Sequence, residues 1–371
     1  MRLSDIIRKK TGQQPLDAKD VRKEPQFIPS PRAPQEPQTQ ETEQAPQVQV
    51  QDIQKLDSAE QVYSEAIDNV KKFLVNVEKN KLDINPLLNV ARKITALAVA
   101  GNEELLVLCS HTTPDLYLYS HCANTSILTA NLGYAMGYSS DDLEKMTLCA
   151  LVHDAGMIKI VSISEKPSKI SQRDFNEVKK HVAFTKELLN NVNMSPQMRV
   201  LVNSVVSQVH ERKDGSGYPK GLAGEETNVY AKIIGVADVY EALTHPRAWR
   251  EATLPHEALK KMIDIAEAEF DINMVKLFIE KISLYPIGSY VRLNSEEIAR
   301  VVGSNPGMPT RPKLRVIVDS ENKRVLGQKF IDLGTNSIFF ITEPVDETRL
   351  RLTDKKLTLE LKAKRWWVKN I

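Results

Sequence analysis

Six histidine and aspartate residues recur through the middle of the chain at nearly equal intervals. Each lies on or at the end of an apolar pattern typical of a helix, and the successive gaps are 32, 28, 29 and 28 residues. Antiparallel helices of a bundle bring side chains at such intervals back to one level. Imidazole and carboxylate groups that converge there suit iron, manganese or zinc, so the pattern indicates a metal-dependent hydrolase. The residues are His121, the pair His153-Asp154, His181, His210 and Asp238.

Capping signals predict where the helices that carry these residues begin. Serine, threonine and aspartate accept hydrogen bonds from the first N–H groups of a helix, and proline is favoured in its first turn. We expect these helices to form one metal-binding domain over residues 113–285. The predicted starts are Thr113-Pro114-Asp115 for the His121 helix, Ser139 with Asp142 for the helix ending at His153-Asp154, Ser171 with Asp174 for the His181 helix, and Ser195-Pro196 for the helix ending at His210.

The first 56 residues have the composition of a disordered tether. Residues 13–56 contain seven of the nineteen prolines and little that a core could bury, so folding would not offset their ordering entropy. The basic, amphipathic residues 1–12 are either a docking peptide for a protein partner or a frayed terminus. Ser58 with Gln61 forms a capping-box pattern and predicts a helical segment over residues 57–112.

The last part of the chain, residues 286–371, predicts a small β module and a tail. Short runs such as Leu314 to Val318 alternate apolar and polar residues between turn-forming clusters. Leu357, Leu359 and Leu361 continue with a period of two, which extends the strand pattern. The tail ends in Lys364-Arg365-Trp366-Trp367; we expect it to cover apolar surface of the module rather than touch a membrane or a partner.

Composition narrows the location and the partners. The net charge of +2 over 371 residues offers no argument for binding to a nucleic-acid polymer or a membrane. Cys109, Cys122 and Cys149 form no CxxC pair and read as buried thiols in a reducing cytoplasm. We see no continuous apolar run long enough for a transmembrane segment and no signal peptide, so we expect a cytoplasmic protein.

Each candidate ligand is weak evidence when it is taken alone. An adjacent His153-Asp154 pair occurs often by chance. His181 shares a helix face with Val178, Phe184 and Leu188, and by itself it reads as a core histidine. Because the other candidate residues occur at regular intervals, we interpret these residues as metal ligands.

The segment after His210 is the most specific part of the sequence. Asp214-Gly215-Ser216-Gly217-Tyr218-Pro219 is a turn-forming run that would present Tyr218 over the site. Together with His153-Asp154 it resembles the HD-GYP family, bacterial phosphodiesterases of the HD superfamily that cleave cyclic di-GMP. The resemblance spans about residues 113 to 285. It continues through Lys166-Pro167, the run Asp238-Val239-Tyr240-Glu241-Ala242-Leu243-Thr244, Arg247 and Arg250.

The resemblance implies a fold and a cofactor. We expect a mainly α chain: an HD-type helical bundle, preceded by a disordered tether and a helical segment and followed by a small β module. The family resemblance implies two, sometimes three, iron or manganese ions. His121, His153, Asp154 and Asp238 would bind one ion, and Asp154 would bridge to a second ion held by His181 and His210.

The resemblance also implies roles in catalysis and substrate binding. Two metals polarise a phosphoryl group and lower the pKa of a bridging water, so that a hydroxide attacks in line; His153 and Asp154 would be the catalytic pair. Tyr218 would contact a guanine base, and Arg247 and Arg250 would hold phosphate. Glu241, on the same helix face as Asp238, either orients groups around the site or substrate, or is a solvated acid.

Three positions depart from the family pattern. Val209 stands where a second histidine usually precedes His210, and it continues an apolar stripe with Val202, Val205 and Val206, so the second ion loses a donor. Met157 replaces a lysine, and Tyr117 replaces an acid found in members with a third ion. We therefore expect one firm metal site, a weaker second site and no third.

Two classes of function remain open from the sequence. The first is a slow, metal-dependent cyclic di-GMP phosphodiesterase. The second is a catalytically impaired cyclic dinucleotide receptor or interaction platform, favoured by Val209 and Met157. A third interpretation, an HD hydrolase acting on another phosphoester, is disfavoured by the Tyr218 loop.

Overall fold

The computed structural model describes residues 57–77, 82–110, 117–164, 166, 168–347, 349–352 and 354–363. The predicted tether and docking peptide, residues 1–56, lie outside these ranges. So do Thr113-Pro114-Asp115, Pro167 and the tail 364–371, and the expectations placed on them stay predictions. Residues Leu56–Ile371 form one compact unit.

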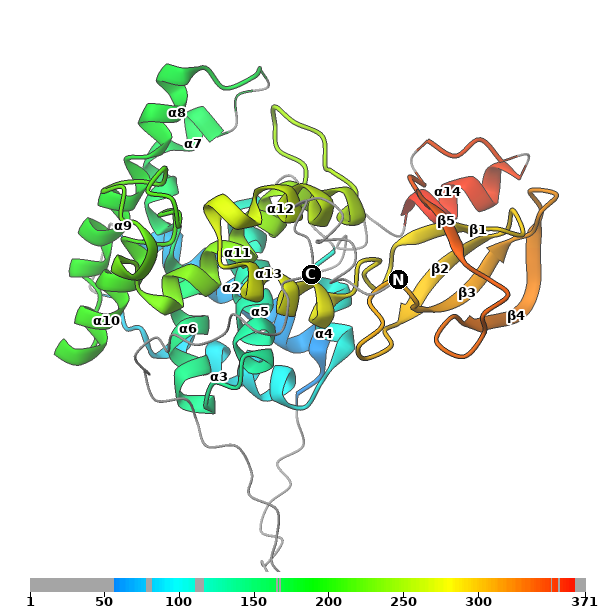
Figure 1. Ribbon diagram of the computed structural model, residues 1–371. Helices are drawn as coiled ribbons and strands as arrows, with labels where there is room; N and C mark the ends of the chain where they lie inside the picture. Colours follow the sequence, from blue (N-terminus) through cyan, green and yellow to red (C-terminus); the bar gives the residue numbers. More distant parts are fainter. Residues whose placement is uncertain are drawn as a thin grey trace, which may run out of the picture. The chain divides into compact units, whose positions relative to one another are not determined.

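A helical bundle precedes a small antiparallel sheet (Figure 1). The predicted mainly α fold with a small β module is thereby confirmed for the described part of the chain. The helices of the bundle are α2 (Ala59–Asn76), α3 (Asn85–Val99), α4 (Glu103–Leu108), α5 (Tyr117–Ala135), α6 (Ser140–Val152), the 3-10 helix η2 (Ala155–Ile160), α7 (Val161–Ser164), α8 (Gln172–Val178), α9 (His181–Asn190), α10 (Pro196–Val206), the 3-10 helix η3 (Gly224–Glu226), α11 (Val229–Thr244), α12 (Pro255–Glu269) and α13 (Ile272–Ile282).

Helix α5 is the centre of the bundle. Helices α2, α3, α6, α11 and α13 all pack against it, and residues 120–133 are buried without interruption. A helix buried on every side shows no amphipathic stripe, and small residues such as Ala123, Ala130 and Gly133 let its neighbours approach. The helix therefore carries His121 into the interior.

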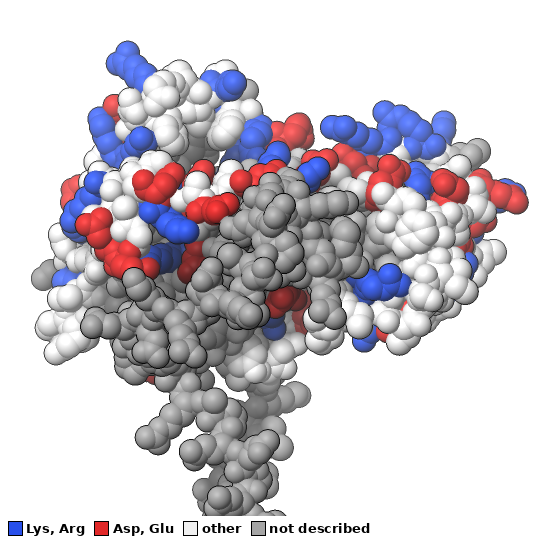
Figure 2. Space-filling view, viewed as in Figure 1, with Lys and Arg blue, Asp and Glu red and all other residues white. Residues whose placement is uncertain are grey.

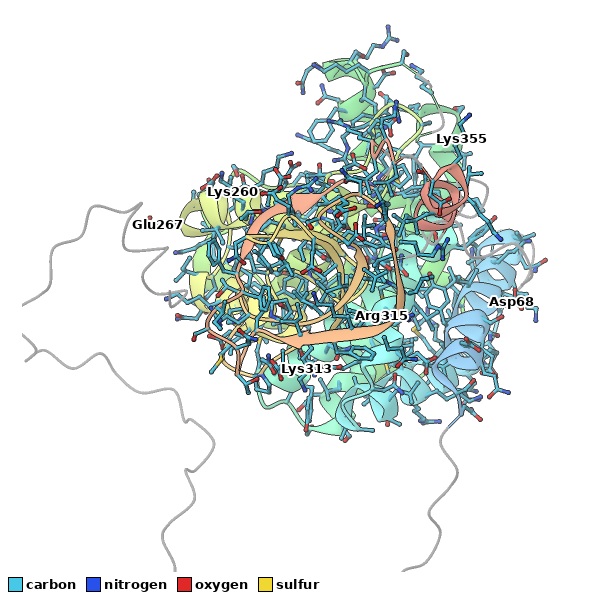
Figure 3. The ribbon with its side chains drawn as sticks, turned by 90° about the vertical axis from the view of Figure 1, so that its right-hand side faces the viewer. Asp68, Lys260, Glu267, Lys313, Arg315 and Lys355 are labelled. Atoms are coloured by element: carbon cyan, nitrogen blue, oxygen red, sulfur yellow. The ribbon has the colours of Figure 1, made fainter. Side chains whose placement is uncertain are left out.

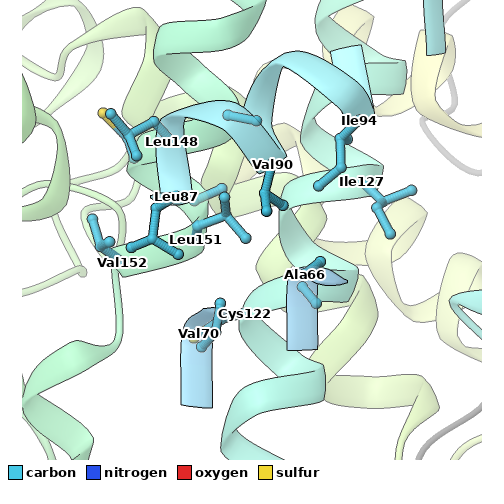
Figure 4. Close-up of a cluster of buried hydrophobic side chains, with 14 of the residues drawn as sticks. Ala66, Val70, Leu87, Val90, Ile94, Cys122, Ile127, Leu148, Leu151 and Val152 are labelled. Atoms are coloured by element: carbon cyan, nitrogen blue, oxygen red, sulfur yellow. The ribbon is translucent and has the colours of Figure 1, made fainter. Parts of the chain in front are cut away.

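The core links the N-terminal helices to the metal-site helices. Figure 4 shows Ala66 and Val70 of α2, three residues of α3, and Leu148, Leu151 and Val152 of α6 in one apolar cluster around Cys122 and Ile127 of α5. Burial of these side chains, at about 25 cal/mol per Å² of apolar surface, fixes the position of α6. The end of α6 is where His153-Asp154 lies.

The predicted capping signals hold where the structure describes them, with two changes of extent. Ser58 and Gln61 form a capping box, and Ser139 accepts from the N–H of Asp142. Ser171 caps only the short α8, and a separate helix, α9, begins at His181. Ser195 caps α10, which ends at Val206, before His210. A cap fixes a helix start, whereas its end depends on tertiary contacts.

The β module is a sheet of five antiparallel strands in the order β4-β3-β2-β1-β5. One face buries Val291, Ala299, Val301, Leu314 and Val316, and the other carries a second apolar cluster. The strands are β1 (Tyr290–Leu293), β2 (Ile298–Gly303), β3 (Lys313–Val318), β4 (Arg324–Asp332) and β5 (Ile341–Val345).

The strand predicted from Leu357, Leu359 and Leu361 is wrong. Residues Lys355–Ala363 form helix α14. Asp354 precedes it, and the Asp354 side chain accepts from the N–H of Leu357 at 2.9 Å. Leu357 and Leu361, one turn apart, are each 1% exposed on the second face of the sheet, whereas Leu359 is 67% exposed. Three leucines at every second position indicate a strand, but the first and third are also four residues apart and so share one face of a helix.

One stretch, Ser140–Ile163, is long and apolar enough to cross a membrane by length and composition, but 67% of its apolar window is buried within the protein. It contains His153 and Asp154, and a core helix passes the same test. On the face shown in Figure 2, basic and acidic side chains are interspersed.

The three cysteines are buried free thiols, as predicted, and burial raises the pKa of both Cys122 and Cys149 to about 12.

Candidate metal centre

The six candidate ligands meet at one place inside the bundle. His121 comes from α5, His153 and Asp154 follow α6, His181 begins α9, His210 follows α10, and Asp238 lies on α11. All six are at least 92% buried. They form two trios in which one ligand atom per residue lies within 4.8 Å of the others: His121, His153 and Asp238, and Asp154, His181 and His210.

Asp154 lies between the two trios. Its Oδ1 is 3.1 Å from His181 Nε2, 3.4 Å from His210 Nε2 and 3.5 Å from His153 Nε2. Its Oδ2 is 3.4 Å from Nε2 of His121. One carboxylate therefore faces all four imidazoles, which is the position that a bridge between two ions requires.

The opposite nitrogens of three histidines are already engaged. His153 Nδ1 lies 2.8 Å from the carbonyl of Ala150, and His181 Nδ1 lies 2.6 Å from the carbonyl of Val178. Nδ1 of His121 contacts the carboxylate of Glu241. A ring that donates from Nδ1 presents the lone pair of Nε2, so these three rings offer Nε2 to the centre.

Glu241 is a support of the centre and not a solvated acid. It is fully buried, and its Oε1 accepts from Asn124 Nδ2 at 3.2 Å while its Oε2 contacts His121. His245, one turn further on, lies 3.2 Å from the same carboxylate. Glu241 thus contacts the far side of a candidate ligand, and its predicted contact with substrate stays a prediction.

Gly156 allows the second trio to form. A Cβ built there would lie 2.1 Å from the carbonyl oxygen of His181 and 2.5 Å from the nitrogen of Thr185. Instead, the N–H of Gly156 donates to Thr185 Oγ1 at 2.8 Å, and that hydroxyl donates to the carbonyl of His153 at 3.2 Å. The close packing of η2 on α9 brings His181 to Asp154.

The loop after His210 folds back on it. Tyr218 stacks on the His210 ring, with centroids 4.9 Å apart and planes 12° from parallel. Glu211 holds the loop, since its two carboxylate oxygens accept from the N–H groups of Lys220 and Leu222 at 2.8 and 2.9 Å. Gly217 has no room for a Cβ, which would lie 2.4 Å from the backbone of Glu211. Tyr218 thus lies at the metal centre, as expected, but against a ligand ring.

The two predicted phosphate-binding arginines differ in their surroundings. The Arg247 side chain is 11% exposed and lies over the ring of Tyr117, with its guanidinium carbon 3.7 Å from the centroid; its Nη2 is 3.7 Å from Glu241 Oε2. Its Nη1 is buried and has no hydrogen-bond partner in the described residues. Arg250 instead donates to the carbonyls of Ala242 and Leu243 at the end of α11. Its guanidinium is therefore committed to the protein backbone.

The three departures from the family pattern have clear positions. Val209 is 1% exposed and packs with Val202, Val205 and Val206, as the apolar stripe predicted. Met157 lies in η2, where its N–H donates to the carbonyl of Asp154 at 2.9 Å. Tyr117 stacks on His121, with centroids 5.8 Å apart. None of the three offers a nitrogen or carboxylate ligand.

The buried charges of the centre stabilise one another. Burial raises the pKa of Asp154 and of Asp238, but the surrounding histidines outweigh it and hold both pKa values below the usual range. Burial lowers the pKa of His121, but Glu241, Asp154 and Asp238 together raise it well above its ordinary value. Both aspartates are therefore ionised, as metal ligands must be.

Two buried atoms at the centre lack a hydrogen-bond partner in the described residues: His153 Nε2 and Asp154 Oδ1. Buried polar atoms are rarely left unsatisfied, and an imidazole nitrogen and a carboxylate oxygen are both metal-ligand atoms. The donor set therefore fits a divalent transition metal.

Comparison with known proteins agrees with this geometry. Residues 109–274 match the family described as HD domain, and residues 290–352 match the one described as KOW domain associated with HD domain. The HD match contains all six candidate ligand positions and the Tyr218 loop, and it ends in α13. Residues 109–274 of this chain therefore form an HD domain.

Several curated relatives of this chain are named phosphodiesterases. A cyclic di-GMP phosphodiesterase of Pseudomonas aeruginosa is 29% identical over 243 residues, 65% of this chain and 58% of the relative. One from Borreliella burgdorferi is 28% identical over 247 residues, 66% of this chain and 64% of the relative. A 3'3'-cGAMP-specific phosphodiesterase of Vibrio cholerae is 28% identical over 171 residues, which are 46% of this chain and 36% of the relative. The chain thus spans about three fifths of the length of the first two.

The sequence interpretation missed several residues that build the centre. Asn124, Glu211 and His245 had no assigned role, although each contacts a ligand's support or the Tyr218 loop. Glu211 is adjacent to the candidate ligand His210 in sequence, and this adjacency could have indicated its role. Asn124 and His245 lie 121 positions apart, and no local pattern links them.

Proposed function

We propose that this chain hydrolyses a phosphodiester bond of a cyclic dinucleotide at a centre of divalent metal ions. The observation that carries the proposal is the position of Asp154, whose carboxylate lies within 3.5 Å of the Nε2 atoms of all four histidines. A single shared carboxylate between two trios of ligands is the arrangement of a dinuclear site. The named relatives act on cyclic di-GMP and on 3'3'-cGAMP, which supports the substrate class.

The residues divide between two ions. His121, His153, Asp154 and Asp238 would hold the first, and Asp154, His181 and His210 would hold the second, with iron or manganese as the metal. Bound ions would polarise the phosphoryl oxygen and lower the pKa of a water molecule between them. The second ion has fewer protein ligands, because Val209 is part of the core, so it would bind more weakly and turnover would be slow.

The protein's own side chains would orient the ligands and the substrate. Glu241 and the carbonyls of Ala150 and Val178 keep three imidazoles in the ligand orientation. Arg247, with a buried Nη1 that has no partner in the described residues, would donate to a phosphate oxygen. Tyr218 would hold the His210 ring and present its exposed edge to a base. Burial raises its pKa above the ordinary value of 10.0, so the hydroxyl stays protonated.

A second function, a cyclic dinucleotide receptor without turnover, is favoured by one specific observation. Arg250 is engaged by the carbonyls at the end of α11, which leaves Arg247 as the arginine available to phosphate. Together with the absence of a ligand at Val209, this would weaken transition-state stabilisation more than binding.

The two functions are separated by one preparation. The full chain is purified without oxygen, its iron and manganese content is measured, and it is incubated with cyclic di-GMP and 3'3'-cGAMP while products are resolved by chromatography. The proposal expects metal in the protein and a linear dinucleotide or mononucleotide that accumulates with enzyme concentration. Tight dinucleotide binding with no product, in protein that contains two metals, would establish the receptor instead.

Variants identify the source of any product. Asp154→Asn removes the bridging carboxylate and should abolish hydrolysis. Asp141→Asn is the matched control, since Asp141 is on α6 with a side chain 74% exposed. Equal hydrolysis by both variants would show that the product arises elsewhere and would overturn the proposal.

A further inference from the structure

A cavity of about 490 Å³ lies between the helical bundle and the sheet, with no candidate metal ligand in its lining. This volume is within the range of small-molecule sites, roughly 300–1,000 Å³. Its walls are held together by direct bonds. Ser304 donates to Glu103 at 2.7 Å, and the N–H of Leu284 donates to the carbonyl of Pro309 at 2.9 Å. The first bond joins α4 to the β module, and the second joins the residues that follow α13 to the β module.

Two nitrogen atoms in the lining are buried and have no hydrogen-bond partner in the described residues: Nε of Arg300 and Nδ1 of His256. Arg300 lies on β2, and His256 lies in the first turn of α12. A guanidinium only donates hydrogen bonds, and a buried donor without an acceptor is costly. Nε of Arg300 therefore has no acceptor in the described residues, and an oxygen of a ligand would satisfy it.

Aromatic and aliphatic side chains form much of the remaining wall. His256 and Tyr285 stack with ring centroids 5.0 Å apart and planes 7° from parallel, and Leu106, Leu128 and Ile287 also line the space. Parallel flat rings at a cavity wall favour a flat aromatic ligand, which extends the stack or meets an edge.

The other charges of the lining limit the charge of the ligand. Glu103, Glu251, Glu280 and Glu347 also border the cavity, against the cations Lys281 and Arg300. Burial lowers the pKa of Lys281, which weakens it as an anion partner. A ligand with several phosphates would meet these carboxylates, whereas a small molecule with one acidic group needs only the guanidinium.

We propose that this cavity is a second ligand site, separate from the metal centre, that binds a small aromatic carboxylic acid. The carboxylate pairs with Arg300, and the ring lies against His256 and Tyr285. None of the residues that line the cavity is a candidate metal ligand, and His245, which contacts Glu241, is the point where the cavity adjoins the support of the metal centre.

Arg315 provides a matched control. It lies opposite Arg300 on the neighbouring strand β3, where Figure 3 labels it, and its Nε is also buried without a partner in the described residues. It does not line the cavity. The two arginines therefore share strand context and differ in access to the proposed ligand.

The test is calorimetric titration of the metal-loaded full chain with nicotinate, 4-hydroxybenzoate and indole-3-carboxylate. We expect at least one probe to bind, Arg300→Met to weaken that binding about 10- to 100-fold, Arg300→Lys to restore part of it, and Arg315→Met to leave it unchanged. Melting temperatures of the variants show that each is folded. Excess cyclic di-GMP should not displace the probe.

Five outcomes would overturn the proposal. The first four are no binding of any probe, equal binding by Arg300→Met, displacement by cyclic di-GMP, and loss of binding in Asp154→Asn, which would place the probe at the metal centre. A chain that binds a probe only after Trp366→Ala and Trp367→Ala substitution would show that the tail is the occupant, and it would also overturn the proposal.

Discussion

Glu241 lies directly behind His121, with its carboxylate against Nδ1 of the imidazole, on the side opposite Asp154 and Asp238. The carboxylate accepts the Nδ1 proton, so Nε2, which faces the two aspartates, is the nitrogen available to a metal. A glutamate three residues after a candidate ligand thus determines which tautomer of a second ligand, 120 positions earlier, is available to a metal.

Glu241→Gln should lower metal affinity about 10- to 100-fold, the range found for outer-shell partners of metal ligands. The amide would donate to His121 Nδ1, which reverses the tautomer and turns an N–H toward the centre. Metal titration and thermal melting check this result. The control is Glu225→Gln, since the Glu225 side chain is 95% exposed. A Glu241→Gln protein that keeps its metal would contradict the role given to this carboxylate.

Asp154→Asn should remove most of the bound metal, because the substitution neutralises the one carboxylate that faces all four histidines. We expect the loss to include both ions, whereas His181→Gln should remove only the weaker one. Elemental analysis of protein prepared side by side distinguishes these cases. Loss of one ion in Asp154→Asn would mean that this side chain does not bridge.

Gly156→Ala should separate η2 from α9, since the new Cβ would lie 2.1 Å from the His181 carbonyl. Overpacking of this kind costs about 1–3 kcal/mol, and His181 should move from Asp154, so the second ion is lost first. The control is Gly307→Ala, at a residue with φ +71° and open space around it. That change should cost roughly 1 kcal/mol from backbone strain alone and leave metal content unaltered. Chemical denaturation and metal analysis report the two effects.

Tyr230→Phe should lower stability in a pH-dependent way. The Tyr230 hydroxyl donates to Asp142 at 2.6 Å, joining the start of α11 to the start of α6, and this bond and Ser139 hold the pKa of Asp142 below its usual range. A depressed pKa contributes stability above the unfolded value, about 3.9, which is lost as pH falls through the folded pKa.

The difference between the native chain and Tyr230→Phe should therefore be present at pH 7, roughly 1 kcal/mol or less for this partly exposed pair, and should shrink below about pH 4. Denaturant melts at several pH values measure it. Tyr138→Phe is the control, because the Tyr138 ring packs edge-on against Tyr230 without a hydroxyl bond in the described residues. A constant difference from pH 7 to pH 3 would contradict the linkage.

The sequence by itself determined the ligand candidates, the helix starts and the division into a bundle and a β module. Caps such as Ser139 with Asp142 act through backbone groups two or three residues away, so they are encoded locally. The regular spacing of His121, His153 and His181 can also be recognised in the sequence, because helices of similar length return side chains to the same level of a bundle. Val209 could be placed in the core from the sequence, because it continues the apolar stripe of Val202, Val205 and Val206.

Only the tertiary structure decided how the remaining residues act. Glu241 lies against His121 because the buried part of α5 brings that imidazole to it. Arg250 donates to the carbonyls at the end of α11, which no sequence pattern indicated. The residues after Asp354 formed a helix because the second face of the sheet buries Leu357 and Leu361 together. Burial and partner choice depend on which surfaces meet across more than a hundred residues, and no local period records that.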